Sequence, residues 1–311
     1  ERVALAKHIR ERGWLRAIWK HRFLYLLGLP GMLFMFVFSY GPMPGIIIAF
    51  QDFYISRGFF RSPWVGFANF QRLFTSQDFW LILRNSLAIS VLHIILLFPA
   101  PIILALMLNE VRSQLYKRFL QTIYYLPHFL SWVIVASLTY FLLSTEVGVI
   151  NKLILAQGGT KIPFLMEKRW FYPIILTQSW WKGVGWGTIV YLAAIAGLDP
   201  ALYEAAQIDG AGRWAQTWYI TIPGIMPTVR VLFILSLGGL LSTNFEQLWL
   251  MGNTMIRDVS EVIDTYVYRI GVLEGQFSYT TAVGMFKSVV GLILILTANW
   301  AANKFGEEGI W

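Results

Sequence analysis

The stretch "EAAQIDGAGRWAQTWYITIP" (204–223) is polar, yet the chain on both sides of it is apolar enough to lie in lipid. Just before it, Asp199 and Pro200 form a good N-cap followed by a good first helical residue. This pair predicts a short helix that runs to about Ile208.

A turn and a second helix are predicted from the glycines and the proline of the same stretch. Asp209-Gly210 indicates the turn, and Gly212 allows a second unusual backbone angle. We expect a second helix over about 213–222, ending before Pro223 because the residue before a proline disfavours the helical conformation. The segment 199–223 is therefore predicted to be a helix–turn–helix pair on the membrane surface.

The first helix of this pair is too short to be stable alone and needs packing from elsewhere. Its apolar side is too small to form a core; it consists of Leu202, Ala205, Ala206 and Ile208. Glu204 and Asp209 would offer charge to a groove in another protein. Two interpretations stay open: docking into a partner protein, or a structured loop that packs only on this chain's own helices.

The composition indicates an integral membrane protein. Of the 311 residues, 57% are hydrophobic and 14% are charged, against about a quarter charged in soluble domains, and the mean hydropathy is +0.57. The lack of cysteine excludes disulfides and thiolate metal sites, and the four histidines include no i, i+4 pair of the kind that binds zinc. The chain starts with Glu1 rather than methionine, which is compatible with further residues or a targeting segment before it.

Six segments are long and apolar enough to cross a bilayer, which takes roughly 20 helical residues. They are 23–41, 85–108, 123–143, 172–196, 228–250 and 281–303. Prolines inside the second and third segments indicate kinks, either around a cavity or from ordinary packing. The predicted fold class is an all-α membrane protein with six transmembrane helices.

Lysine and arginine near the ends of these segments predict the orientation. Seven bases precede the first segment, and three more lie in the short loop after the second, which places both on the cytoplasmic side. Both termini and the segment 199–223 are then expected in the cytoplasm. Within 1–22, apolar residues recur at i, i+3 and i, i+4 between the bases, which predicts an amphipathic helix on anionic lipid rather than a nucleic-acid-binding arm.

The polar stretch resembles the EAA motif of membrane subunits of binding-protein-dependent ABC importers, whose pattern is approximately EAAxxDGA…IxLP. Ile220 also matches, whereas Ile222 stands where leucine is usual. In that family the short helix is a coupling helix that sits in a cleft of a separate ATPase subunit. The resemblance implies ATPase-coupling roles for Glu204, Ala205, Ala206, Asp209, Gly210, Ala211, Gly212 and Pro223.

The resemblance extends over most of the chain and is closest to the subgroup that imports oligosaccharides and polysaccharide fragments. The stretches that carry it are "VGFANFQRLF" (65–74), "YYLPHFLSWVIV" (124–135), "VGVINKLI" (147–154), "WWKGVGWGTIVYLAAIAGLDPALYEAA" (180–206), "SEVIDTYVYRIG" (260–271), "TAVGMFKSVVG" (281–291) and "GEEGIW" (306–311). It implies a type I importer permease fold over 23–311, in the bacterial inner membrane. The first membrane subunit of alginate importers is a candidate close relative.

The same resemblance implies the partners. They are a second homologous permease subunit, two ATPase subunits that bind ATP and Mg²⁺, a periplasmic or lipid-anchored solute-binding protein, an oligosaccharide and membrane lipid. The chain has no Gly-Lys dipeptide and therefore no P-loop. We expect no cofactor in this chain and no nucleic acid, with ATP hydrolysed by another chain.

Ionisable and aromatic side chains within the spans are candidates for the substrate path, because sugars are recognised by aromatic faces and directional polar groups. The candidates are Trp180, Trp181, Lys182, Trp186, Tyr191, Asn244, Glu246 and Lys287. For Trp180 and Trp181, an aromatic belt or ordinary packing is the favoured explanation. The two lysines would suit an acidic sugar such as alginate, unless Glu246 or the partner subunit neutralises them.

Two other classes of protein are alternatives. A secondary, ion-coupled sugar transporter would use intramembrane Lys182, Glu246 or Lys287 for proton coupling, but it leaves 204–223 unexplained. A membrane-embedded enzyme would need paired catalytic acids, a metal-ligand helix or a nucleophile motif, and the spans contain none of these.

Overall fold

The computed structural model describes residues 19–304, and most of the predicted amphipathic helix over 1–22 lies outside that range. The described chain is helical throughout and contains no strand, only an isolated bridge between Gln51 and Trp64. The chain divides into two compact units, 1–66 and 67–311. The all-α prediction is confirmed.

The first unit contains the first span. It consists of α2 (Arg22–Met35), a π-helical turn η1 (Phe36–Tyr40) and a 3₁₀ segment η2 (Met43–Phe50), which together form an apolar helix of 29 residues. The short α3 (Gly58–Arg61) follows. The apolar window of this helix has no residue buried within the chain, as expected for a surface covered by lipid or by another subunit.

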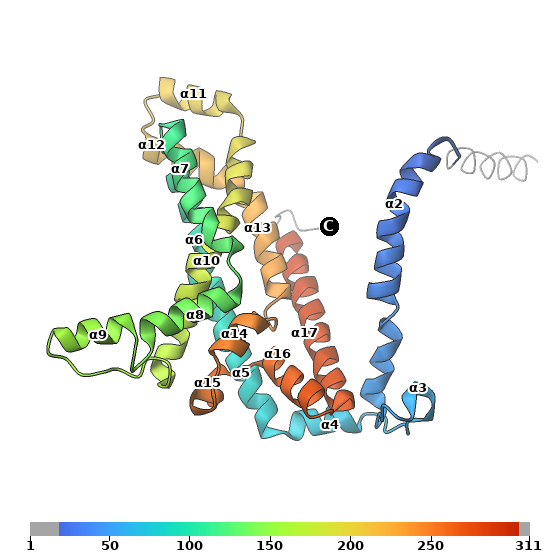
Figure 1. The fold of residues 1–311 in the computed structure, drawn as a ribbon. Coiled ribbons are helices and arrows are strands. Elements are labelled where there is room, and N and C mark those ends of the chain that lie inside the picture. Colours follow the sequence, from blue (N-terminus) through green and yellow to red (C-terminus); the bar gives the residue numbers. More distant parts are fainter. Residues whose placement is uncertain (1–18, 305–311) are drawn as a thin grey trace, which may run out of the picture. The chain divides into compact units, whose positions relative to one another are not determined.

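The second unit contains the remaining spans (Figure 1). Continuous helical spans cover Gln77–Asn109, Arg213–Gly238 and Phe277–Lys304, the last being α17. The first of these joins α5 (Gln77–Leu92), η3 (His93–Leu97) and α6 (Pro99–Asn109). The single helix α10 (Lys168–Ala196) has 29 residues, about 44 Å of helix, and α11 (Pro200–Ile208) leaves it at 69°.

The third predicted span is not one helix. The structure has α7 (Gln114–Tyr125) and a 3₁₀ turn η4 (Leu126–Phe129), and then α8 (Trp132–Leu143) at 97° to them. Pro127 lies in the 3₁₀ turn, and the Ser131 hydroxyl caps α8 by accepting from the Ile134 amide. A cap of this kind starts a new helix instead of continuing the old one.

The fifth predicted span, 228–250, is misplaced. The helix begins at Arg213 and ends at Gly238 as α12 (Arg213–Gln216), η5 (Thr217–Thr221) and α13 (Ile222–Gly238). Residues 239–244 then break it, and Asn244 caps the separate α14 (Phe245–Met251). Leucines and aromatic residues lie on both sides of the polar residues Ser242, Thr243 and Asn244, so hydropathy averaged over a whole span did not locate the break.

Short elements complete the second unit. They are α4 (Ala68–Thr75), α9 (Val149–Ala156), η6 (Thr254–Ile256), α15 (Arg257–Ser260), α16 (Ile263–Val267) and η7 (Tyr268–Leu273). The helix α11 lies at one end of this unit, and α15 lies towards the opposite end (Figure 1). These two ends carry different candidate sites.

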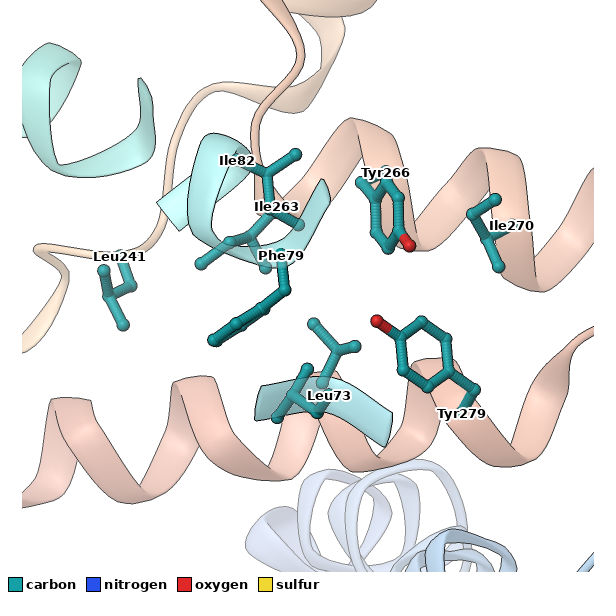
Figure 2. Packing of buried hydrophobic residues seen from close by; sticks show 9 residues of the cluster. Leu73, Phe79, Ile82, Leu241, Ile263, Tyr266, Ile270 and Tyr279 are labelled. Atoms are coloured by element: carbon teal, nitrogen blue, oxygen red, sulfur yellow. The ribbon is translucent and has the colours of Figure 1, made fainter. Parts of the chain in front are cut away.

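One hydrophobic core lies at the α15 end and joins α4, α5, α16 and α17. Figure 2 shows its members; they are Leu73, Phe79, Ile82, Leu241, Ile263, Tyr266, Ile270, Tyr279 and Val283. Phe79 packs edge-on against Phe286 at 5.2 Å. Burial of these side chains fixes α16 and η7 between the spans.

Buried amides add directional ties to this packing. Asn85 is fully buried and donates to the carbonyl oxygens of Asp258 and Glu261, both at 2.9 Å. The next residue, Ser86, accepts from the Ile263 amide at 3.0 Å. The middle of α5 therefore holds the segment 258–263 in one conformation.

Candidate functional site

The predicted surface helix is present with the predicted bounds. Helix α11 starts at Pro200 and ends at Ile208, and the Asp199 carboxylate caps it by accepting from the Ala201 amide at 2.9 Å. The cap satisfies a backbone donor that has no partner within the helix. The structure thus agrees with the local sequence pattern at both ends of α11.

The turn after α11 depends on one of its two glycines. Gly210 has φ of +78°, a left-handed conformation that other residues rarely adopt, and the Ala211 amide donates back to the Ala206 carbonyl at 2.8 Å. Gly212 has φ of −70° and ψ of 169°, an ordinary extended conformation. The expectation of a second unusual angle at Gly212 is wrong.

The second helix of the predicted pair does not end before Pro223. It continues through Pro223 into α13 as the fifth span. The π-helical turn η5 ends at Thr221, two residues before Pro223. Proline has no backbone N–H and cannot donate the regular helical hydrogen bond, and the wider turn accommodates this. The segment 213–222 is therefore the first part of the span, which follows α11 after a turn of four residues, 209–212.

Helix α11 presents a largely exposed surface. Ile208 is 86% exposed and Leu202 is 52% exposed, and Glu204, Ala205 and Asp209 are also exposed. A hydrogen bond of 2.9 Å between the Tyr203 and Thr221 hydroxyls ties its inner side to the fifth span. Apolar side chains left exposed on a nine-residue helix favour a partner protein over packing on this chain alone.

Lys182, in the middle of α10, is held at the break of the third span. Its ammonium donates to the carbonyl oxygens of His128 and Leu130, both at 2.6 Å, and lies 5.5 Å from the Trp132 ring centroid. These carbonyls lie where the chain passes from η4 to α8. The ammonium also interacts electrostatically with the exposed Glu246 carboxylate.

An aromatic platform adjoins this lysine. The His128 and Trp186 rings stack at 4.2 Å with planes 4° apart, and Phe129 meets Trp186 edge-on at 6.0 Å. Trp186 is 47% exposed. Trp180 and Trp181 are likewise half exposed. His128, Phe129 and Trp186 form an aromatic surface with one cation near it, the combination that suits sugar recognition.

Two other candidates have different surroundings. Tyr191 is buried with Ala105, Ile195 and Ile225 in a core cluster, which makes it a packing residue of this chain. Lys287 forms an ion pair with Asp264, a partner that the sequence had not indicated.

The remaining two candidates lie on α14. The Asn244 side chain caps this helix through the Gln247 amide at 3.1 Å, and Asn244 and Glu246 are both exposed. The structure thus brings Lys182 and Glu246 towards one another, but leaves Tyr191 and Lys287 apart from them.

The sequence argument missed a buried amide network between α8, α10 and α14. Gln178 donates to Thr139 at 2.6 Å, Gln247 donates to Gln178 at 3.0 Å and to the Ile175 carbonyl at 2.8 Å, and Ser179 donates to Gln247 at 2.9 Å. Glutamines inside apolar segments were the available signal, because buried polar groups in lipid need partners. Among residues 19–304, no group of three or more His, Cys, Asp or Glu side chains could hold a metal ion.

The fold defines a multi-pass membrane protein that carries an exposed helical hairpin at one end. A family model described as "Binding-protein-dependent transport system inner membrane component" matches residues 97–306, and the chain belongs to this family. It is a permease subunit of the inner membrane with a type I importer fold, and it works with a solute-binding protein. The family and the relatives support an importer permease and not the alternative, an ion-coupled sugar transporter.

Individual relatives match over nearly the whole chain. The "Polygalacturonan/rhamnogalacturonan transport system permease protein YteP" of Bacillus subtilis (strain 168) is 50% identical, over 99% of this chain and 96% of the relative. "Protein LplB" of the same organism is 50% identical over 96% of this chain and 94% of the relative.

The solved structures agree with these relatives. The crystal structure of a bacterial ABC transporter involved in the import of the acidic polysaccharide alginate is 41% identical, with a TM-score of 0.85 over 94% of this chain and 99% of that chain. A second structure, of bacterial alginate ABC transporter with its alginate pentasaccharide-bound periplasmic protein, is 39% identical with the same TM-score, over 95% of this chain and 99% of that chain.

Proposed function

We propose that this permease subunit imports acidic oligosaccharides, namely uronate-containing fragments of polysaccharides of the polygalacturonan or alginate type. The observation that carries the proposal is the coincidence of two comparisons over nearly the full chain. A relative at 50% identity is named for polygalacturonan and rhamnogalacturonan, and a solved neighbour at 41% imports the acidic polysaccharide alginate. Both are polymers of sugar acids, so a carboxylated sugar is the shared chemistry.

The aromatic surface next to Lys182 supports a sugar path. The stacked rings of His128 and Trp186 offer a flat face to the C–H side of a sugar ring. Lys182 commits two hydrogen bonds of its three donors to backbone carbonyls, which leaves one donor for another acceptor. In this proposal the path uses Trp180, Trp181, Lys182, Trp186, Asn244 and Glu246, whereas Tyr191 and Lys287 act in packing.

The partners and the coupling follow the same proposal. Residues 204–212 of the exposed hairpin dock in a cleft of a separate ATPase subunit, and Pro223 lies in the span that receives the motion. Two such ATPase subunits bind ATP and Mg²⁺ and hydrolyse ATP, and a second, similar permease subunit completes the pathway. This chain itself performs no hydrolysis.

In this proposal the hairpin and both termini lie in the cytoplasm. Six crossings return the chain to its starting side, and the basic loop around Arg112, Lys117 and Arg118 lies on that side by the positive-inside rule. The α15 end then faces outwards, towards the solute-binding protein.

Uptake by the reconstituted importer tests the substrate class. The assembly with its binding protein, in liposomes loaded with ATP, should accumulate trigalacturonate and should take up the carboxyl-reduced, neutral trisaccharide at least about tenfold more slowly. Equal uptake of the two, or uptake of the neutral sugar alone, would reject an acidic substrate. A Glu204→Lys variant should insert normally but lose sugar-stimulated ATP turnover, because the docked surface changes charge; full turnover would reject the docking.

A further inference from the structure

A second polar site lies at the α15 end of the permease, away from the path described above. It is a cavity of about 250 Å³. Two arginines, one tryptophan and one glutamate dominate its wall: Trp249, Arg257, Glu261 and Arg269. These side chains come from α14, α15 and η7 and from Glu261, the residue directly after α15.

Glu261 fixes the two guanidinium groups beside one another. Its carboxylate accepts from Arg269 Nε at 2.7 Å, and from Arg257 Nε at 3.1 Å and Nη2 at 3.3 Å. The Glu261 side chain is only 12% exposed. The Asn85 amide holds the Glu261 backbone through its carbonyl, so the carboxylate that orients both arginines is itself fixed.

The arginines retain donors after these bonds. Each guanidinium has five N–H donors. Arg257 commits two of them to Glu261, and Arg269 commits one to Glu261 and one to Glu274, so three remain on each. Two arginines and Glu261 line the wall, and Glu274 outside it forms a second ion pair with Arg269 at 2.8 Å, so spare donors rather than a net charge remain for a ligand. A fixed arginine fork with spare donors is suited to a carboxylate.

Arg269 keeps its charge despite its burial. Burial lowers the pKa of Arg269, but the hydrogen bonds and charges of Glu261 and Glu274 raise it by more. Two further charged groups nearby have contacts of their own. Lys168 forms an ion pair with Asp258, and Arg84 donates a hydrogen bond to the Asp258 backbone carbonyl. Neither contact uses a donor of Arg257 or Arg269.

An aromatic face completes the cavity. Trp249 is 41% exposed, and Phe245 and Tyr268 hold its ring, with centroids at 5.8 Å and 4.8 Å. The Thr254 side chain on the rim is exposed. The cavity is slightly smaller than the range of roughly 300–1,000 Å³ for small-molecule sites, which suits one sugar unit rather than an oligosaccharide.

We propose that this cavity is an outer subsite that binds one uronate unit of the incoming oligosaccharide, with the carboxylate on Arg257 and Arg269 and the ring on Trp249. The assignment rests on the proposed import of acidic oligosaccharides. A sugar fits better than an acidic side chain of the binding protein, because a tryptophan face beside an arginine pair matches a ring that carries a carboxylate.

A single fluorescent label reports on the cavity directly. The chain has no cysteine, so Thr254→Cys gives a unique attachment point on the rim once the cysteines of the other subunits are replaced. The labelled importer in nanodiscs, without binding protein, is titrated with trigalacturonate and with its carboxyl-reduced analogue. We expect a saturable shift with trigalacturonate and an at least tenfold weaker response to the neutral sugar.

Matched variants test whether the fluorescence change comes from binding in this cavity. Arg257→Gln should weaken trigalacturonate binding about tenfold, the loss expected for hydrogen bonds to a charged group. Arg169→Gln is the control, because Arg169 is also exposed and also paired with a glutamate, but it lies outside the cavity wall. An unchanged titration in Arg257→Gln, or equal responses to both sugars, would overturn the proposal.

Two further outcomes separate the subsite from the wider function. A label that stays silent with trigalacturonate and responds only to sugar-free binding protein would assign the cavity to a side chain of that protein, against our proposal. If the same assembly takes up trigalacturonate but the label shows no change in fluorescence, the proposed subsite is rejected and the proposed function stands. Absence of acidic-sugar uptake would instead reject the proposed function.

Discussion

The Lys182 ammonium lies 2.6 Å from the carbonyl oxygen of His128, a residue in another helix and 54 positions earlier in the chain. An equal contact to the Leu130 carbonyl makes one lysine the partner of two backbone acceptors at the break of the third span. A broken helix leaves carbonyls without intrahelical partners, and water is scarce at this depth. Lys182 therefore stabilises the bend and, through His128, the position of the aromatic platform.

Lys182→Met should destabilise the assembly, because it leaves both carbonyls without this donor. The expected loss is roughly 1–3 kcal/mol for each carbonyl that finds no new partner. Thermal unfolding of the purified complex measures it, with Lys152→Met on the exposed face of α9 as the control. Equal melting temperatures for the two variants would show that Lys182 does not stabilise the bend.

The glycines next to Lys182 have unequal surroundings. A Cβ on Gly185 would lie 2.0 Å from the Tyr124 carbonyl oxygen, whereas a Cβ on Gly183 would meet nothing within 4 Å. Gly185→Ala should therefore separate α10 from α7, lower the melting temperature by several degrees and reduce the yield of assembled complex. Gly183→Ala gains the same helix propensity without a clash and should keep or raise stability. Similar melting curves for both would contradict the close approach of the two helices.

Local patterns predicted α11 well, and the reason is that its signals are local. The cap at Asp199, the proline at the first helical position and the left-handed Gly210 act within a few residues of one another. Four of the six spans, counting the one that includes α10, likewise follow from apolar length. The resemblance to the importer family added the class of protein, which no local pattern provides.

Tertiary contacts decide the features that the sequence did not predict. Pro127 indicated a kink, but the 97° bend becomes favourable only because Lys182 satisfies its carbonyls from another helix. The fifth span was misplaced because leucines and aromatic residues recur through 239–250, although Gly239 ends the helix and Asn244 starts another. Lys287 and Tyr191 were assigned to the path because sequence spacing gives no information about Asp264 or the core cluster.

The ion pair between Lys287 and Asp264 predicts a loss of stability that can be measured separately from transport. Both side chains are 22% exposed, and Asp264 also accepts from the Thr243 amide at 3.0 Å. Lys287→Met should cost about 2–4 kcal/mol, because it leaves a largely buried carboxylate without its cation. Thermal unfolding of the complex should show this loss, and the double variant Lys287→Met/Asp264→Asn should recover much of it.

Transport by the double variant distinguishes the two roles of Lys287. If the pair acts only in packing, sugar uptake by Lys287→Met/Asp264→Asn should stay within about twofold of the unmodified importer. A severe loss of uptake in a double variant of restored stability would instead return Lys287 to the substrate path.

The two glycines of the surface hairpin offer a matched test of coupling. Gly210 has φ of +78°, which costs an L-residue about 1–2 kcal/mol, whereas Gly212 at φ of −70° accepts any side chain. Neither Cβ would meet an atom within 4 Å, so the two alanine substitutions differ in backbone strain alone. Gly210→Ala should alter the turn and lower sugar-stimulated ATP turnover several-fold, and Gly210→Pro should abolish it, because proline cannot adopt a positive φ. Gly212→Ala should turn over ATP normally, and all three variants should reach the membrane in equal amounts. Normal turnover in Gly210→Pro, or a loss in Gly212→Ala as large as in Gly210→Ala, would show that the shape of this turn does not transmit the motion.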